Sequence, residues 1–391
     1  MTTSRRDLLA AGAAFALPGK PAWPFGRQKP PKGCRGRSAY AGGPLRPQIA
    51  PADFDAAAAA GAGRATPLAS DDLDSRLEKA AKAEKSQGYT AAIARSDRVL
   101  WTQTGGTVAP VAFEWPGLGD VLVATAILQL VEETKLALDT TIERWAPEVS
   151  TARWITVEDL LSHTSGLADP IQAQAPPAAA YCPGAGWAQT GADYGLLRRI
   201  LASVDGRPVR EAVAERIVAR LELKEATIAA DASAITASSA DVVRIWRAVL
   251  GGGLQSAETT RRRFLRLYPM TVEPARLHWG LGATVSDLAA DRSNPADVWL
   301  GLSGSRPGAS VAVAYSIRKR AFAAVALTGA GSAEEVIDLL LLGVPSDPSH
   351  VDLTAPAPPS VRRARRRRPK PKAAAKSVPV PATPLPPARR P

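Results

Sequence analysis

The sequence predicts an α+β domain, and three segments carry this prediction. Apolar side chains between Val121 and Val131 cover most of a helix circumference, which indicates a helix buried on nearly all sides. Residues 89–106 alternate between apolar and polar on either side of a short polar turn, which predicts a β-hairpin. Two more alternating apolar runs flank residues 316–320, so a second hairpin is expected late in the chain.

Composition separates the ends of the chain from its middle. The 391 residues are 46% hydrophobic, which is enough for one large core. The net charge is +12, yet residues 354–391 hold eleven basic and no acidic residues, and residues 1–64 hold ten basic against three acidic. The middle of the chain is therefore acidic, and the high isoelectric point gives no reason to expect that the folded body binds nucleic acid.

The first 30 residues resemble a twin-arginine export signal. Arg5 and Arg6 precede a weakly apolar run at 8–17 that is too short to span a membrane. We therefore expect export to the periplasm or cell envelope, with a disordered basic start as the alternative. No other stretch approaches the ~18 continuous apolar residues of a membrane helix, so no transmembrane segment is expected in the mature chain.

The rest of the chain divides by composition into linker, body and tail. Residues 31–67 are rich in Pro, Gly and Ala and are expected to be a disordered linker. Residues 68–345 form the predicted folded body, and residues 346–391 a disordered, basic, proline-rich tail. The expected helices of the body, besides the buried one, are 73–87, ended by Gly88, and 207–229 and 240–250.

Several short patterns occur in one order and at one spacing. The buried helix is followed by a KLALD turn, by APE at Ala146–Glu148 and by LLSHTSGL at 160–167, and later by Pro183, Gly184 and Trp187. Together they resemble the class C beta-lactamase and penicillin-binding serine hydrolase family. The resemblance implies a beta-lactamase/DD-peptidase-like fold, in which helices flank an antiparallel sheet and a helical subdomain is inserted between the early and late strands.

The same resemblance places substitutions at all three catalytic motifs of the family. The family opens the buried helix with S-x-x-K, and the matching residues are Gly117 and Asp120. Its Y-x-N motif corresponds to Gln189 and Gly191. The His or Lys of its third motif corresponds to Leu302, followed by Ser303 at the small hydroxyl position. No catalytic residue is therefore expected at these positions.

The resemblance leaves three hypotheses of function. The first is a silent relative that binds a peptidoglycan-like or small-molecule ligand through Gly117, Gln189, Ser303 or Ser305, with no metal and no cofactor. The second is an active peptidase, esterase or beta-lactamase with a displaced nucleophile, for which Ser303, Ser305 and Ser165 are candidates. The third is an envelope scaffold that acts through its basic tail.

Two residue pairs match catalytic motifs only literally, and one further histidine is a candidate base. Ser316 and Lys319 spell S-x-x-K but lie in a predicted hairpin turn, and His278 with Gly280 spells H-x-G in a predicted strand at 278–285. His163 could act as a general base, but a packed or capping histidine is favoured because this loop is mainly architectural in the family.

The basic tail suggests a polyanionic partner. It has no aromatic residues among its arginines, so no specific nucleic acid is expected. If the chain is exported, the tail would meet an anionic envelope surface, at roughly 1 kcal/mol per basic residue near a charged membrane. A solubilising tail without a specific partner remains the alternative.

Overall fold

The computed structural model describes residues 70–95, 98–107, 112–168, 182–223, 225–270, 277–287 and 298–345. The predicted export signal at 1–30, linker at 31–67 and tail at 346–391 lie outside these residues, as does the turn predicted within 89–106. Within the described part of the chain, no helix is both long and apolar enough to cross a membrane.

An eight-stranded sheet forms the framework, and every neighbouring pair of its strands is antiparallel. Its order is β2-β1-β11-β10-β9-β8-β7-β6, so the first hairpin pairs with the last strand of the domain. The strands are β1 Ser86–Arg95, β2 Arg98–Gly106, β6 Tyr268–Pro269, β7 Leu277–Trp279, β8 Thr284–Asp287, β9 Val298–Arg306, β10 Ala309–Ser316 and β11 Ala321–Gly329. This arrangement confirms the predicted fold class.

A second, three-stranded sheet lies at the start of the helical part. It consists of β3 Phe113–Pro116, β5 Ala234–Ala237 and β4 Thr227–Ile228, in that order. β3 leads directly into the buried helix α3, Leu118–Glu132.

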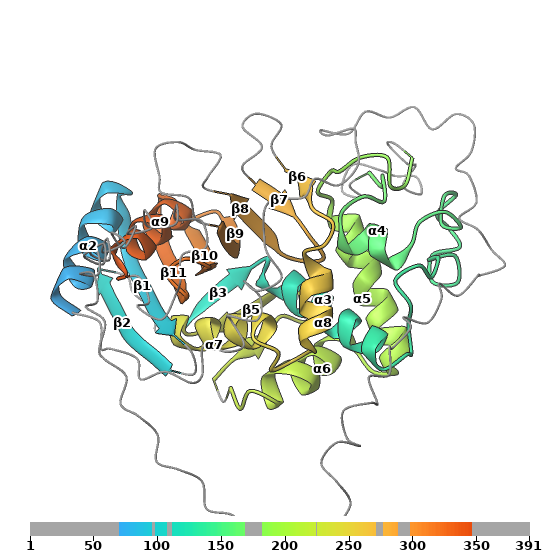
Figure 1. Cartoon of the computed structure of the whole chain (residues 1–391), viewed down its shortest axis with the longest axis horizontal. Coiled ribbons are helices and arrows are strands. Elements are labelled where there is room, and N and C mark those ends of the chain that lie inside the picture. The colour runs from blue at the N-terminus through green and yellow to red at the C-terminus, as the bar shows by residue number, and fades with distance from the viewer. Residues whose placement is uncertain are drawn as a thin grey trace, which may run out of the picture. The chain divides into compact units, whose positions relative to one another are not determined.

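Helices cover both faces of the large sheet (Figure 1). α2 (Ser70–Ala83) and α9 (Ala333–Gly343) pack together on one face, and α7 (Ser239–Leu250) packs on β1, β10 and β11. The remaining helical segments surround α3: α4 Val157–Leu161, α5 Gly191–Asp205, α6 Val209–Val213, the π-turn η2 Ala214–Ala219 and α8 Ala257–Arg263.

The helix α3 is the centre of the larger core. Every residue from Leu118 to Leu130 except Asp120 is buried, which confirms the sequence-based expectation for this segment. Gly119 permits this packing, because a Cβ there would lie only 2.4 Å from the carbonyl oxygen of Ala232, just before β5. A smaller core, with Leu77, Trp299 and Ala312 among its members, lies on the α2 and α9 side of the sheet.

Three predicted element boundaries are wrong. The helix expected at 73–87 ends at Ala83, because Lys85 has a positive φ of 57° and Gly88 already pairs within β1. The helix expected at 207–229 is split into α6 and η2, and its last residues form β4. The strand expected at 278–285 is two strands, β7 and β8, joined by a turn in which Gly282 has a φ of 77°.

The burial of α3 gives a test of stability. Leu122→Ala should lower the free energy of unfolding by about 2–5 kcal/mol, because it removes a fully buried side chain and leaves a cavity. The control is Leu339→Ala, at a leucine on α9 that is 49% exposed. This variant should change the free energy of unfolding by less than about 0.5 kcal/mol. Urea unfolding measures both, and equal losses would contradict the assigned core.

Candidate functional site

The first and third motif positions lie against each other. Gly117 is the N-cap of α3 and adopts a left-handed conformation with a φ of 77°. A Cβ built on it would lie 3.7 Å from both Cδ atoms of Leu302, which is ordinary van der Waals contact. On the same strand, a Cβ at Gly304 would lie 2.3 Å from the carbonyl oxygen of Pro116, so β9 passes directly beside the end of β3.

These two positions present only a bare α carbon and an apolar side chain. Leu302 is buried, and Gly117 is only partly exposed. Nothing here can attack a carbonyl carbon or transfer a proton. The structure thus brings together the two positions that the resemblance aligned, without the groups that the family carries there.

Asp120, at the position of the motif lysine, is held in an ion pair. Its carboxylate accepts a hydrogen bond from Nη2 of Arg198 on α5, and the two side chains are 28% and 16% exposed. Burial raises the pKa of the Asp120 carboxyl, and the charge of Arg198 acts in the opposite direction with a smaller effect. A carboxylate fixed in this way cannot replace a lysine amine that activates a serine.

Two glycines on α5 open the path by which Arg198 reaches Asp120. Gly191, Gly195 and Arg198 follow the i, i+4, i+7 spacing of one helix face. A Cβ at either glycine would have no neighbour within 4 Å, so the space beside this face is open. Side chains of a helix lean towards its N-terminus, which lets the guanidinium extend along the bare face.

The second motif positions begin α5 and stay at the surface. Gln189 is exposed, and Gly191, also exposed, is the first residue of the helix. Thr190 between them is the N-cap, and its hydroxyl accepts the amide N–H of Ala192 at 3.2 Å. Local capping therefore explains this turn, and Gln189 is free to meet a ligand from solvent.

Ser303 and Ser305 are exposed but lie on the opposite side of β9 from Leu302. Side chains alternate along a strand, and Leu302 belongs to the core around α3. Ser303 pairs across the sheet with Ala312, which belongs to the core under α2 and α9. Ser305 pairs with Ser310, whose hydroxyl accepts the N–H of Ala333 at the start of α9. Their hydroxyls are thus not directed at Gly117.

His163 lies within a buried polar group behind the motif positions. Its Nδ1 is 2.8 Å from Oδ2 of Asp193, and the hydroxyl of Ser165 donates to the other oxygen of the same carboxylate. All three residues are at most 2% exposed. Burial raises the pKa of the Asp193 carboxyl, and the hydrogen bond and charge of His163 act to lower it.

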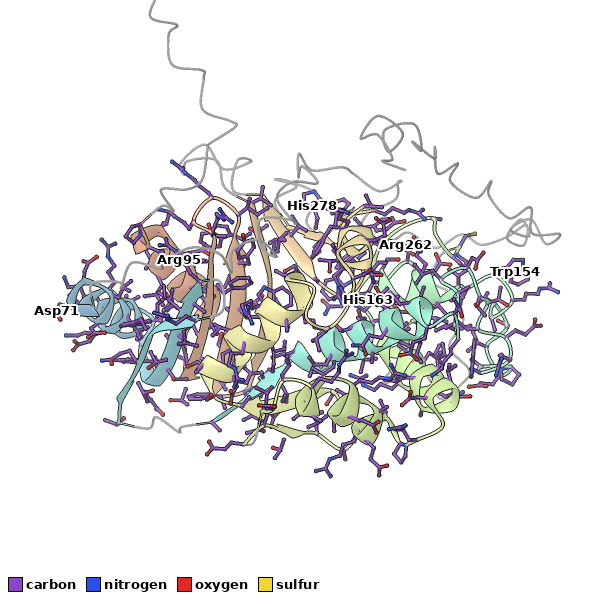
Figure 2. The ribbon with its side chains drawn as sticks, turned by 60° about the horizontal axis from the view of Figure 1, so that its bottom comes forward. Asp71, Arg95, Trp154, His163, Arg262 and His278 are labelled. Atoms are coloured by element: carbon purple, nitrogen blue, oxygen red, sulfur yellow. The ribbon has the colours of Figure 1, made fainter. Side chains whose placement is uncertain are left out.

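Aromatic rings close this buried group off. The ring centroid of His163 lies 5.1 Å from that of Tyr194 and 4.9 Å from that of Trp279. The ring centroid of Trp187 lies 6.3 Å away. Figure 2 shows His163 among the helices, whereas Trp154 lies at the edge of the molecule. No substrate can reach Ser165 in this arrangement, and His163 is a packed histidine.

The literal motif matches lie in structural positions. Ser316 ends β10, and its hydroxyl accepts the N–H of Lys319 at 3.0 Å in the turn before β11. His278 is buried on β7. Among the described residues there is no group of three or more His, Cys, Asp and Glu side chains that could hold a metal ion.

Sequence reasoning missed two residues of this region, Arg198 and Asp193. The signal for Arg198 was present, since a basic residue seven positions after Gly191 on a predicted helix shares its face. The contact between Asp193 and His163 had no such signal, because it depends on how the loop after α4 packs on α5.

Comparisons with known proteins identify the family of the chain and support its fold. The profile of the Beta-lactamase family matches residues 73–343. The esterase EstB of Burkholderia gladioli is 30% identical over 110 aligned residues, which cover 24% of this chain and 28% of the esterase. The chain thus matches little more than a quarter of that relative's length.

Solved structures share the fold at low sequence identity. A D-stereospecific amidohydrolase from a Streptomyces species has a TM-score of 0.62 at 20% identity, covering 71% of this chain and all of the amidohydrolase. The octameric penicillin-binding protein homologue from Pyrococcus abyssi has a TM-score of 0.58 at 17% identity, covering 70% of this chain and 77% of the homologue.

Because Asp120 pairs with Arg198, we expect that a lysine at position 120 would destabilise this chain unless Arg198 is changed as well. Asp120→Lys should lower the free energy of unfolding by about 1–3 kcal/mol, because it places two cations together in a partly buried position. The double variant Asp120→Lys with Arg198→Glu swaps the two charges and restores an ion pair, so it should recover at least half of this loss.

Chemical denaturation of the two variants, beside the exposed control Glu78→Lys on α2, measures the effect. Equal stability of Asp120→Lys and the natural protein would show that the ion pair has no energetic importance.

Proposed function

Because the chain belongs to the beta-lactamase family, we propose that it is a catalytically silent member that binds a ligand at the motif positions without turning it over. The observation that carries the proposal is the contact of Gly117 with Leu302, where the fold presents neither a nucleophile nor a proton-transfer group. The ligand class we propose is a peptidoglycan-like peptide or a related small molecule.

The magnitude of the chemical loss supports the proposal. Removing the nucleophile of a serine hydrolase costs about a factor of 10⁶ in rate, and the remaining acceleration of roughly 10³ to 10⁴ over water comes from the oxyanion hole and binding. In this chain the base and the third-motif cation are replaced as well. Binding is thus the part of the family's activity that the remaining surface can still perform.

The placement of the other hydroxyls argues against a displaced nucleophile. Ser165 is fully buried with its hydroxyl bonded to Asp193. Ser303 and Ser305 stand on the α2 and α9 side of β9, away from Gly117. An active enzyme would need one of them to change faces or become exposed.

We also propose that the protein works outside the cytoplasm, at the cell envelope. Arg5 and Arg6 ahead of a short apolar run support export, and the eleven basic residues of 354–391 would then contact an anionic envelope surface. This contact would keep the ligand-binding body close to the envelope.

A labelling and binding experiment on the full chain tests the silent-site proposal. A fluorophosphonate or fluorescent penicillin should give no covalent label, because no hydroxyl in the described part of the chain is both exposed and beside a base at the motif positions. An acyl-D-alanyl-D-alanine peptide should bind in calorimetry and be recovered uncleaved. Labelling that disappears on Ser303→Ala or Ser305→Ala would overturn the proposal in favour of an active hydrolase.

Matched tryptophan variants locate the binding site in the same experiment. Gly191→Trp should weaken peptide binding at least about ten-fold, or ~1.4 kcal/mol, because the new side chain fills the open space beside α5. Ala185→Trp, at an exposed residue just before this helix, should leave binding unchanged. Binding that survives Gly191→Trp would place the ligand elsewhere.

A reporter fusion tests the location. The first 30 residues fused to a reporter that is active only after folded export should deliver it to the envelope, and Arg5→Lys with Arg6→Lys should abolish delivery. Unchanged delivery by the double variant would rule out the twin-arginine route, and no delivery by either fusion would remove the envelope proposal.

A further inference from the structure

A cavity of about 360 Å³ lies at the C-terminal end of α3, far from the motif positions. Its walls come from the last turn of α3, from residues 252–256 between α7 and α8, and from Arg220 after η2. At a rise of 1.5 Å per residue, Glu132 lies about 22 Å along α3 from Gly117. The cavity is therefore a separate site at the other end of the same helix.

The cavity contains one carboxylate that no cation neutralises. Glu132 accepts the N–H of Ser256, the N-cap residue of α8, at 2.8 Å. Glu132 forms no ion pair among the described residues. Burial acts to raise its pKa, but hydrogen bonds from Ser256 and Thr259 outweigh this and lower the pKa of the Glu132 carboxyl. It therefore carries its full negative charge at neutral pH.

The neighbouring carboxylate is already neutralised. Glu133 lies 2.6 Å from Nη1 of Arg216 and 2.8 Å from Nζ of Lys135. These contacts, with hydrogen bonds from Arg216 first, lower the pKa of the Glu133 carboxyl to about 2. Glu133 thus adds little net charge to the cavity.

One cation in the wall is also unmatched. Arg220 is exposed, and its guanidinium forms no ion pair with any residue that the structure describes. Glu132 and Arg220 thus line the same cavity, and they form no ion pair with each other.

Gln129 forms a buried part of the cavity wall. Gln129 is 3% exposed, and its Nε2 donates to the carbonyl oxygen of Leu254 at 2.7 Å, which fixes the orientation of the carboxamide. Its Oε1 is buried and has no partner within the described residues. Because this oxygen is enclosed by protein, it is not a contact for a ligand in the cavity, and the role of Gln129 here is to hold the loop at Leu254 in place.

The helix ends around the cavity favour a positive group on the Glu132 side. α3 ends at Glu132, and α7 ends at Leu250 directly before the cavity loop, so the carbonyl ends of both helices lie close by. The C-terminus of a helix carries a partial negative charge that attracts cations. Glu132 and the two helix ends therefore act in the same direction.

We propose that this cavity binds a free α-amino acid, with its ammonium group at Glu132 and its carboxylate at Arg220. A simple anion would meet the Glu132 carboxylate, and a simple cation would meet the Arg220 guanidinium, whereas a zwitterion satisfies both. The site is independent of the ligand proposed for the motif positions, and each can fail without the other.

Three ligands of matched shape test the charge requirement on the full-length protein. L-Leucine carries both charged groups, 3-methylbutylamine only the ammonium, and 4-methylpentanoate only the carboxylate. Calorimetry should show leucine binding at least about ten-fold more tightly than either analogue, because each lacks one of the two charge pairs. Equal affinities, or no binding of leucine up to its solubility, would overturn the proposal.

Two variants assign the ends of the ligand. Arg220→Ala should weaken the binding of leucine about five-fold and leave the affinity for 3-methylbutylamine unchanged. Glu132→Gln, whose carboxamide oxygen can still accept the N–H of Ser256, should weaken the binding of leucine and of the amine but not that of 4-methylpentanoate. The exposed controls Arg210→Ala and Glu78→Gln should change nothing. Leucine affinity unaffected by both cavity variants would place the ligand elsewhere and overturn the assignment.

Discussion

The close approach of β9 to the beginning of α3 is the contact on which the rest of the structure depends. It requires glycine at 304, where a Cβ would overlap the carbonyl oxygen of Pro116, and it brings Leu302 against Gly117. It joins the last strands of the large sheet to the buried helix, so that segments almost 190 residues apart form one core. The motif positions meet because this packing brings them together, whatever side chains they carry.

The chain has kept this framework while exchanging the charges on it. An acid stands at the position that the resemblance aligns with the motif lysine, and Arg198, which reaches it beside Gly191 and Gly195, offsets only part of its cost of burial. A leucine stands at the position of the third-motif cation. Neither residue offers the amine or the cation that the family carries at these positions.

The two ends of α3 have different characters. Its N-terminal end meets a strand and carries the motif positions. Its C-terminal end opens on a cavity lined by Glu132 and Arg220, neither of which forms an ion pair with another described residue. The helix between them is almost wholly buried. A ligand at either end would therefore contact the same packed element, and the polar residue Gln129 forms part of both the core and the cavity wall.

The sequence by itself predicted the fold class and the buried helix, because periodicity and spacing are local properties of the chain. The substituted motif positions are what the family resemblance implies. The sequence also placed Gly117 and Leu302 in one site through the family resemblance. It misjudged the ends of the helices near Ala83 and Val213, since backbone pairing across the sheet and a π-turn decided them. Only the tertiary structure decided that Ser303 faces away from Gly117, that Asp193 joins His163 to Ser165, and that Glu132 and Arg220 share a cavity. Each of these depends on strand register or on contacts between residues distant in sequence, which no local pattern records.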